Sequence, residues 1–84
     1  MRNYWEDEAK AMLRAEMARC KVSYRVLSMR LKEIGVDESE HQLRNKIARG
    51  KFAFSFFLQC MCAMGVVHIL DMPRFDDALA EMKK

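Results

Sequence analysis

The sequence predicts an all-α protein, a compact bundle of four to five helices with room for one short strand near the C-terminus. Its 84 residues include only three glycines and one proline, too few for the many turns of a sandwich or barrel. Eight methionines, together with abundant Ala, Leu, Lys, Glu and Arg, favour helix. The length suits one domain. We therefore expect a single domain over residues 1–84, with its core in 6–66 and a C-terminal extension over 67–84.

The first helix is expected over residues 6–20. Acidic side chains stand in its first turn and basic ones at its end, as the helix dipole prefers. Its apolar residues recur at spacings of three and four, which is the pattern of a helix with one buried face. That stripe consists of Ala9, Met12, Leu13, Met17 and Cys20.

The second helix is expected to begin at Ser23, whose hydroxyl can accept a hydrogen bond from a free backbone N–H of the first turn. Gly35 stands where a glycine commonly ends a helix. Between them one apolar stripe runs through Tyr24, Leu27, Leu31 and Ile34.

The third helix is predicted from Ser39 to Arg49, with Gly50 ending it. Ser39 and Gln42 match a capping box, in which the two side chains bond each other's backbone amides. Only two residues, Leu43 and Ile47, are firm apolar anchors. Much of this helix should therefore face water or a ligand.

The fourth helix is expected over residues 53–64, with Gly65 after it, and it is apolar on nearly every side. Such a helix is buried in a core or covered by a partner. The β-branched residues of 66–70 could form a short strand or an extended tail. A last, weaker helix is expected to open at Asp71 to Asp77 and to run through Met82.

The charge of the chain is concentrated in one place. Residues 1–52 carry 12 basic and 8 acidic side chains, whereas residues 53–84 carry 3 and 4. Within residues 41–51 there are four cations and no anion. Long cations can neutralise phosphates, and Asn, Gln and His can bond base edges. The alternative is an ordinary solvated helix face.

The segment from Met12 to Val66 resembles the lambda-repressor-like helix-turn-helix domains of the Xre/Cro type. The likeness is carried by three stretches: residues 22–31, which look like the helix that opens the turn; residues 43–51, which look like the recognition helix with its closing Gly-Lys; and residues 58–66, which look like a helix ending in an apolar-Gly-Val. Residues 43–60, with the pattern LRNKIARGKF followed by FFLQC, resemble a group of small, uncharacterised bacterial domains more closely still.

The resemblance implies binding of double-stranded DNA, with the third helix in the major groove. His41, Gln42 and Asn45 would then read bases, and Arg44 would read guanine or hold a phosphate. The expected phosphate contacts are Lys46, Arg49 and Lys51, with Arg25, Arg30 and the helix start at Ser23 as further candidates. The alternative role of Ser23 is helix capping alone. The alternative for Arg25 and Arg30 is that their side chains face solvent without contacting DNA.

A homodimer is expected for two reasons. A single small helix-turn-helix reads few base pairs, so such proteins usually occupy paired half-sites. The surplus of apolar side chains in the fourth helix also needs cover. The interface candidates are Phe54, Phe57, Met61, Met64, Val67 and Ile69; filling the core of the monomer is the alternative for each.

Other chemistry is disfavoured by the residues present. Cys60 and Cys62 point in different directions on a helix, and with His68 they cannot supply four zinc ligands. No nucleophile has a base and an oxyanion site nearby. We therefore expect no enzyme activity, metal, cofactor or small-molecule substrate. The odd number of cysteines, without an apolar leader, favours a cytoplasmic protein, associated with the nucleoid when bound to DNA. The lack of a long apolar run favours a chain without a membrane span.

These observations predict a small transcriptional regulator that binds double-stranded DNA as a homodimer. The rival hypothesis is a protein-interaction module, antitoxin-like or an adaptor, that uses the apolar fourth helix. RNA binding is a weaker rival, because residues 41–51 contain no aromatic side chain on which bases could stack.

Overall fold

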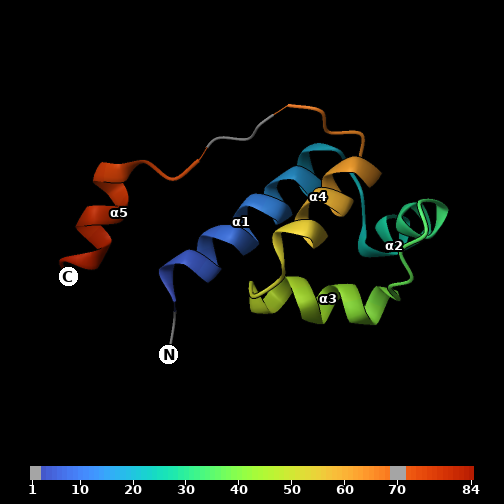
Figure 1. Ribbon diagram of the computed structural model, residues 1–84, viewed down its shortest axis with the longest axis horizontal. Helices are drawn as coiled ribbons and strands as arrows, with labels where there is room; N and C mark the ends of the chain where they lie inside the picture. Colours follow the sequence, from blue (N-terminus) through green and yellow to red (C-terminus); the bar gives the residue numbers. More distant parts are fainter. Residues whose placement is uncertain (1–2, 69–71) are drawn as a thin grey trace.

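The computed structural model describes residues 3–68 and 72–84. Within these residues it is all-α and has no strand, so the expected fold class is confirmed (Figure 1). The sequence left a short strand and an extended tail open for residues 66–70. Residues 66–68 form no strand, and residues 69–70 lie outside the described part of the chain. The helices are α1 (Tyr4–Arg19), α2 (Tyr24–Glu33), α3 (Glu40–Arg49), α4 (Phe54–Ala63) and α5 (Phe75–Met82).

The start of α1 lies two residues earlier than the sequence predicted. The side chain of Asn3 accepts hydrogen bonds from the amides of Trp5 and Glu6, at 2.9 and 3.2 Å. This is an N-cap, and it satisfies two of the amides that a helix start leaves free. The aromatic residues Tyr4 and Trp5 are therefore part of the helix rather than a segment that precedes it.

The caps predicted for α2 and α3 are present. The hydroxyl of Ser23 accepts from the amide of Val26 at 3.2 Å. In α3 the Gln42 amide donates to Ser39 Oγ at 3.1 Å, and the Ser39 amide donates to Gln42 Oε1 at 2.8 Å. This reciprocal pair is the expected capping box. Gly50 ends α3 in the left-handed region.

The core lies among α1, α2, α3 and α4. α2 packs against α3 and α4, and α1 packs against α3, so that α3 runs along one edge of the molecule beneath α1 and α4 (Figure 1). Two interface candidates, Met61 and Met64, are each only 6% exposed and belong to this core. They therefore fill the monomer and are not available to a second copy. The buried cluster consists of Leu13, Met17, Val22, Leu27, Leu31, Leu43, Ile47, Phe56, Cys60, Met61 and Met64.

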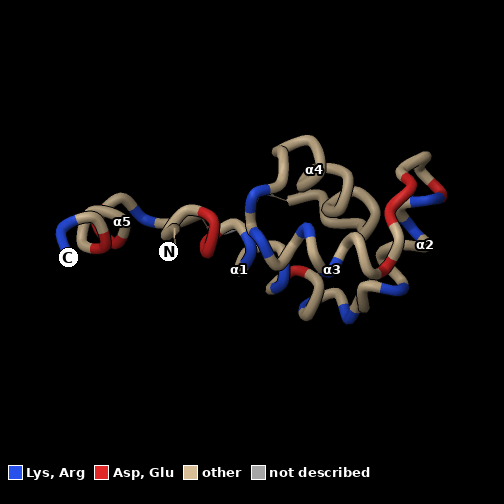
Figure 2. The backbone as a smooth tube through the Cα atoms, turned by 90° about the horizontal axis from the view of Figure 1, so that it is seen from below, with Lys and Arg blue, Asp and Glu red and all other residues tan. Residues whose placement is uncertain are grey.

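The last helix stands apart from this core. α5 begins at Phe75, later than the sequence predicted, and it lies beyond the start of α1 at one end of the molecule (Figures 1 and 2). A cavity of about 420 Å³ separates the two helices, with Tyr4, Glu8 and Asp77 among its lining residues. The pKa of Tyr4 is raised above its usual value, mainly by partial desolvation and further by the nearby carboxylates of Glu8, Asp77 and Glu81.

No helix of the described residues is long and apolar enough to cross a membrane.

Candidate nucleic-acid interface

The outer face of α3 is defined by the two residues that anchor the helix. Leu43 and Ile47 are fully buried, one turn apart, and they hold α3 against the core. The opposite side is exposed, and Figure 2 looks onto this part of the molecule, where Lys and Arg positions follow α3. This exposed side, called the outer face below, consists of His41, Arg44, Asn45, Ala48 and Arg49.

His41 and Asn45 are joined on the outer face. The Nδ2 atom of Asn45 lies 3.1 Å from Nε2 of His41. An amide nitrogen can only donate, so Nε2 of His41 is the acceptor of this hydrogen bond. Asn45 keeps one N–H and its carbonyl oxygen free, and these form an adjacent donor and acceptor.

Gln42 does not belong to the outer face in the same way. Its side-chain oxygen already accepts from the Ser39 amide in the capping box. Pairing with a base through both of its polar atoms would break this bond and weaken the helix start. The structure therefore assigns Gln42 mainly to the capping of α3.

Arg44 is held between two groups. Its guanidinium donates to the Glu40 carboxylate at 3.0 Å and lies 5.1 Å from the centre of the Tyr24 ring. The side chain of Arg44 is still about half exposed, at 51%. An exposed pair of this kind contributes about 1 kcal/mol at most, so the guanidinium can exchange Glu40 for another anion.

Arg44 also closes one side of a small basic pocket at the starts of α2 and α3. Its volume is about 280 Å³. Three arginines, Arg14, Arg25 and Arg44, line it together with Ser23 and one carboxylate residue, Glu40. Arg14 was not among the contact residues predicted from the sequence. It belongs to α1, which packs on α3, and it shares this pocket with Arg44 of α3.

A second group of cations lies at the other end of α3. Lys46, Arg49 and Lys51 line a cleft of about 420 Å³ between the end of α3 and the start of α4. The N-cap of α4, Ala53, makes no side-chain hydrogen bond to the first amides of that helix. Positive charge from the helix start therefore adds to that of the three side chains.

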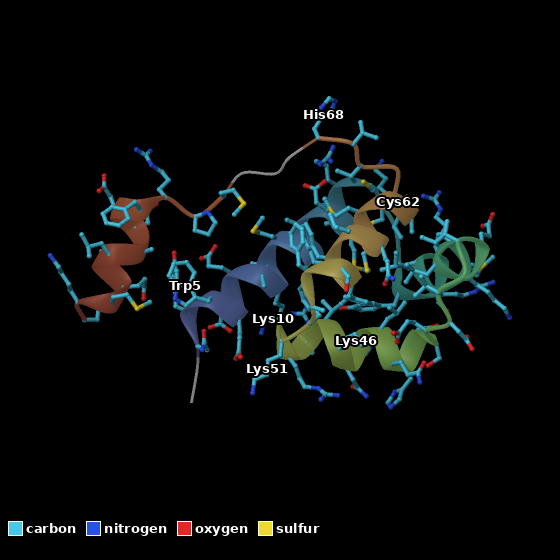
Figure 3. The ribbon with its side chains drawn as sticks, viewed as in Figure 1. Trp5, Lys10, Lys46, Lys51, Cys62 and His68 are labelled. Atoms are coloured by element: carbon cyan, nitrogen blue, oxygen red, sulfur yellow. The ribbon has the colours of Figure 1, made fainter. Side chains whose placement is uncertain are left out.

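The three cations of this cleft differ in their freedom. Lys46 forms an ion pair with Glu38 and lies 4.8 Å from the centre of the Phe56 ring, so it is turned toward α4 (Figure 3). Lys51 is exposed at the end of α3 beside α1 (Figure 3), where its nearest carboxylate, Glu6, is 4.0 Å away. Arg49 is exposed. Lys51 and Arg49 can reach an external anion without breaking a close contact, whereas Lys46 cannot.

Arg30 is tied to another part of the structure. Its Nη1 donates to the backbone oxygen of Ala63 at 3.5 Å, at the end of α4. A cation there stabilises the negative end of that helix. The structure thus groups Ser23, Arg25 and Arg44 with α3 but gives Arg30 a structural partner elsewhere.

The thiol of Cys60 is unsuited to nucleophilic chemistry or metal binding. Cys60 is fully buried, and burial, with a smaller contribution from the Glu38 carboxylate, raises its pKa from 9.0 to about 12. A thiol in that state is neither a nucleophile nor a metal ligand at neutral pH. Among the described residues no three His, Cys, Asp or Glu side chains are grouped to hold a metal ion.

The remaining interface candidates lie on an apolar groove on the α4 side. Phe54 is 71% exposed and Val67 is 83% exposed, while Phe57 is half-buried. Together with Met12, Leu58 and other apolar residues they line a groove of about 390 Å³. Leu58, which was not among the interface residues predicted from the sequence, is a further exposed member of this groove. Ile69 lies outside the described residues.

A family model described as a domain of unknown function, DUF6471, matches residues 5–69. The chain belongs to the DUF6471 family. The matched DUF6471 segment contains nearly all of α1 and the whole of α2, α3 and α4, whereas α5 lies beyond it. Neither the curated proteins nor the solved structures gave a match. The lambda-repressor-like resemblance of this DUF6471 chain stays a hypothesis.

Proposed function

We propose that this DUF6471 protein binds double-stranded DNA through the outer face of α3 and acts as a homodimeric transcriptional regulator. The observation that carries the proposal is the order of side chains along α3. Polar residues that can bond bases occupy the exposed middle, and cations gather at both ends. A helix of ten residues with this distribution suits the major groove, flanked by two phosphate backbones.

Asn45 and Arg44 are the proposed base readers. The free N–H of Asn45 can donate to N7 of adenine, and its carbonyl oxygen can accept from the N6 amino group. The hydrogen bond to His41 holds the Asn45 amide in place. Arg44 can pair with guanine after leaving Glu40, because an exposed ion pair is weak. Gln42 is left out of base reading, since its oxygen caps α3.

Phosphate binding is proposed at the two basic ends. At one end Arg14 and Arg25 line the pocket beside the start of α2, where free amides add positive charge. At the other end Arg49 and Lys51 face the cleft at the start of α4. Each phosphate neutralised would release condensed counterions, so the affinity should fall with salt.

The test is fluorescence anisotropy with a labelled random duplex, measured at increasing salt, followed by selection of bound duplexes from a random pool. We expect binding at low ionic strength that weakens with salt, and an enriched sequence with paired half-sites. The matched control is Lys83→Ala, which removes a cation on the exposed end of the chain beyond α5. It should leave the salt dependence unchanged. Absence of binding at low salt would refute the proposal.

A second candidate function is favoured by the exposed groove beside α4. Phe54 and Leu58 leave large apolar surface in water, which in soluble proteins commonly marks a protein-binding site. A protein-interaction module would use this groove and would show no salt-dependent DNA binding. The same anisotropy measurement therefore separates the two functions.

A further inference from the structure

The exposed apolar surface of the chain is concentrated in two places. Of the ten large apolar side chains that are exposed within the described residues, seven belong either to the groove beside α4 or to α5. Phe54, Leu58, Val67 and Met72 line the groove. The other three form one stripe along α5: Phe75, Leu79 and Met82.

The stripe on α5 has the form of a helix that docks into a groove. Its members are spaced at i, i+4 and i+7, so they lie on one side of the helix over about 10 Å. Phe75 is 78% exposed, although it is the largest side chain of α5. Acidic Asp76 and Asp77 stand beside it in the first turn and stay in water when the stripe is covered.

The chain does not cover its own groove with α5. α5 lies at the end of the molecule beyond the start of α1 (Figure 1), where Ala78 is only 7% exposed. Ala78 lies next to the stripe on α5, whereas Phe75 and Met82 themselves are 78% and 54% exposed. The stripe and the groove remain open at the same time, and Met72, which lines both the groove and the cavity beside α5, lies between them.

We infer that two copies of this chain pair reciprocally, with the Phe75–Leu79–Met82 stripe of each copy seated in the groove of the other. A convex helix and a concave groove on one chain are complementary, and a two-fold axis then satisfies both at once. Each copy contributes the seven exposed apolar side chains of its groove and stripe, so the pair contributes fourteen. If each side chain loses about 100 Å² of accessible surface, the interface buries about 1,400 Å² in total. That is within the range of stable specific interfaces, which bury about 1,200 Å² or more.

This inference specifies the homodimer of the proposed function and in that respect rests on it. Its observations, however, concern only apolar surface, and its test uses no DNA. If the protein did not bind DNA, the dimer could still form. If the protein did not dimerise, DNA binding by the monomer could still be measured. The two outcomes are therefore distinguishable.

The experiment is sedimentation equilibrium of the full chain without DNA, with circular dichroism to confirm that each variant is folded. We expect a dimer for the unmodified protein. Phe75→Glu and Leu58→Lys should each weaken the dimer at least about tenfold, because each places a charge in the apolar contact. Val67→Lys serves as a second groove variant at a position outside the helices. Ala80→Glu, which adds a charge on the other side of α5, is the matched control and should remain dimeric.

A mixture of two monomeric variants gives the sharpest result. In an equimolar mixture of Phe75→Glu and Leu58→Lys, one of the two contacts is made by an unmodified stripe and an unmodified groove. We expect heterodimers to form where neither variant pairs alone. Three results would overturn the inference: an unmodified chain that is monomeric, a dimer that survives Phe75→Glu, or a mixture that stays monomeric.

Discussion

Gly50, which ends α3, lies against the backbone of Glu6 in the first turn of α1. A Cβ atom on Gly50 would be 2.9 Å from the carbonyl carbon of Glu6 and closer still to its oxygen. Gly50 also has φ +68°, a conformation that favours glycine. Glycine is therefore required here twice, once by the turn and once by the approach of α1. This contact fixes the basic end of α3 relative to the rest of the fold.

Replacing Gly50 by alanine should destabilise the protein by about 2–4 kcal/mol, the sum of backbone strain and overpacking. Gly35→Ala is the matched control, because Gly35 has φ +85° and no atom within 4 Å of the position of a Cβ. It should cost only about 1 kcal/mol. Urea unfolding of both variants measures the difference, and equal losses would show that the contact with Glu6 is unimportant.

Replacing Lys21 by glycine should stabilise the protein by about 1 kcal/mol. Lys21 has φ +56° just after α1, where the amide of Val22 donates to the backbone oxygen of Met17 at 2.9 Å. Glycine adopts this helix ending without the steric cost of a Cβ atom. Thermal unfolding would show a higher midpoint. Lys21→Ala removes the same charge but keeps the Cβ, so a rise in that variant too would contradict the conformational explanation.

The stability of the fold should fall between pH 9 and pH 12 because of Cys60. Burial raises the pKa of this thiol from 9.0 to about 12. Below pH 9 the thiol is protonated in both the folded and the unfolded state. Above it the unfolded state loses the proton first, so each further pH unit costs about 1.4 kcal/mol of unfolding free energy.

Cys60→Ala should lose this part of the pH dependence, although the variant is less stable overall because it leaves a cavity. The measurement is urea unfolding at pH 8, 9 and 10. Cys62→Ala is the control, since Cys62 is exposed, and its slope should match that of the unmodified protein. Identical slopes for all three proteins would contradict the assignment to Cys60.

Replacing Asn45 by alanine should weaken binding to a selected DNA site by about 1–3 kcal/mol and leave binding to random duplex nearly unchanged. The reason is that base pairing is lost while the phosphate contacts stay. Competition anisotropy with both duplexes measures the ratio of the affinity for the selected site to the affinity for random duplex. An equal loss on both would show that Asn45 does not read a base. Arg44→Ala, tested in the same way, decides whether Arg44 contacts guanine or phosphate.

Replacing Lys51 by alanine should weaken binding to all duplexes alike and reduce the slope of log affinity against log salt by about one unit. Lys51 is exposed and only loosely paired, so it can neutralise one phosphate. Lys46→Ala is the contrasting variant, because Lys46 is engaged by Glu38 and Phe56. If the salt slope of the Lys51 variant were unchanged, or if the slope changed more in the Lys46 variant than in the Lys51 variant, Lys51 would not be the phosphate contact.

The amino-acid sequence by itself determined the helices and several of their ends. The caps at Ser23 and Ser39 and the ends at Gly35 and Gly50 depend on hydrogen bonds and backbone angles within a few residues, so spacing alone predicts them. The same applies to the exposed face of α3, which follows from two apolar anchors one turn apart. The Asn3 cap was equally local, but its signal was missed.

Tertiary structure decided which of those residues act together. Lys46 lies on the predicted DNA-binding helix, yet Glu38 and Phe56 turn it toward α4. Met61 and Met64 are as apolar as Phe54, yet only the methionines reach the core. Arg14 of α1 shares a pocket with residues of α3, on which α1 packs. Contacts between segments far apart in the chain depend on how whole helices pack, and no local spacing encodes that arrangement.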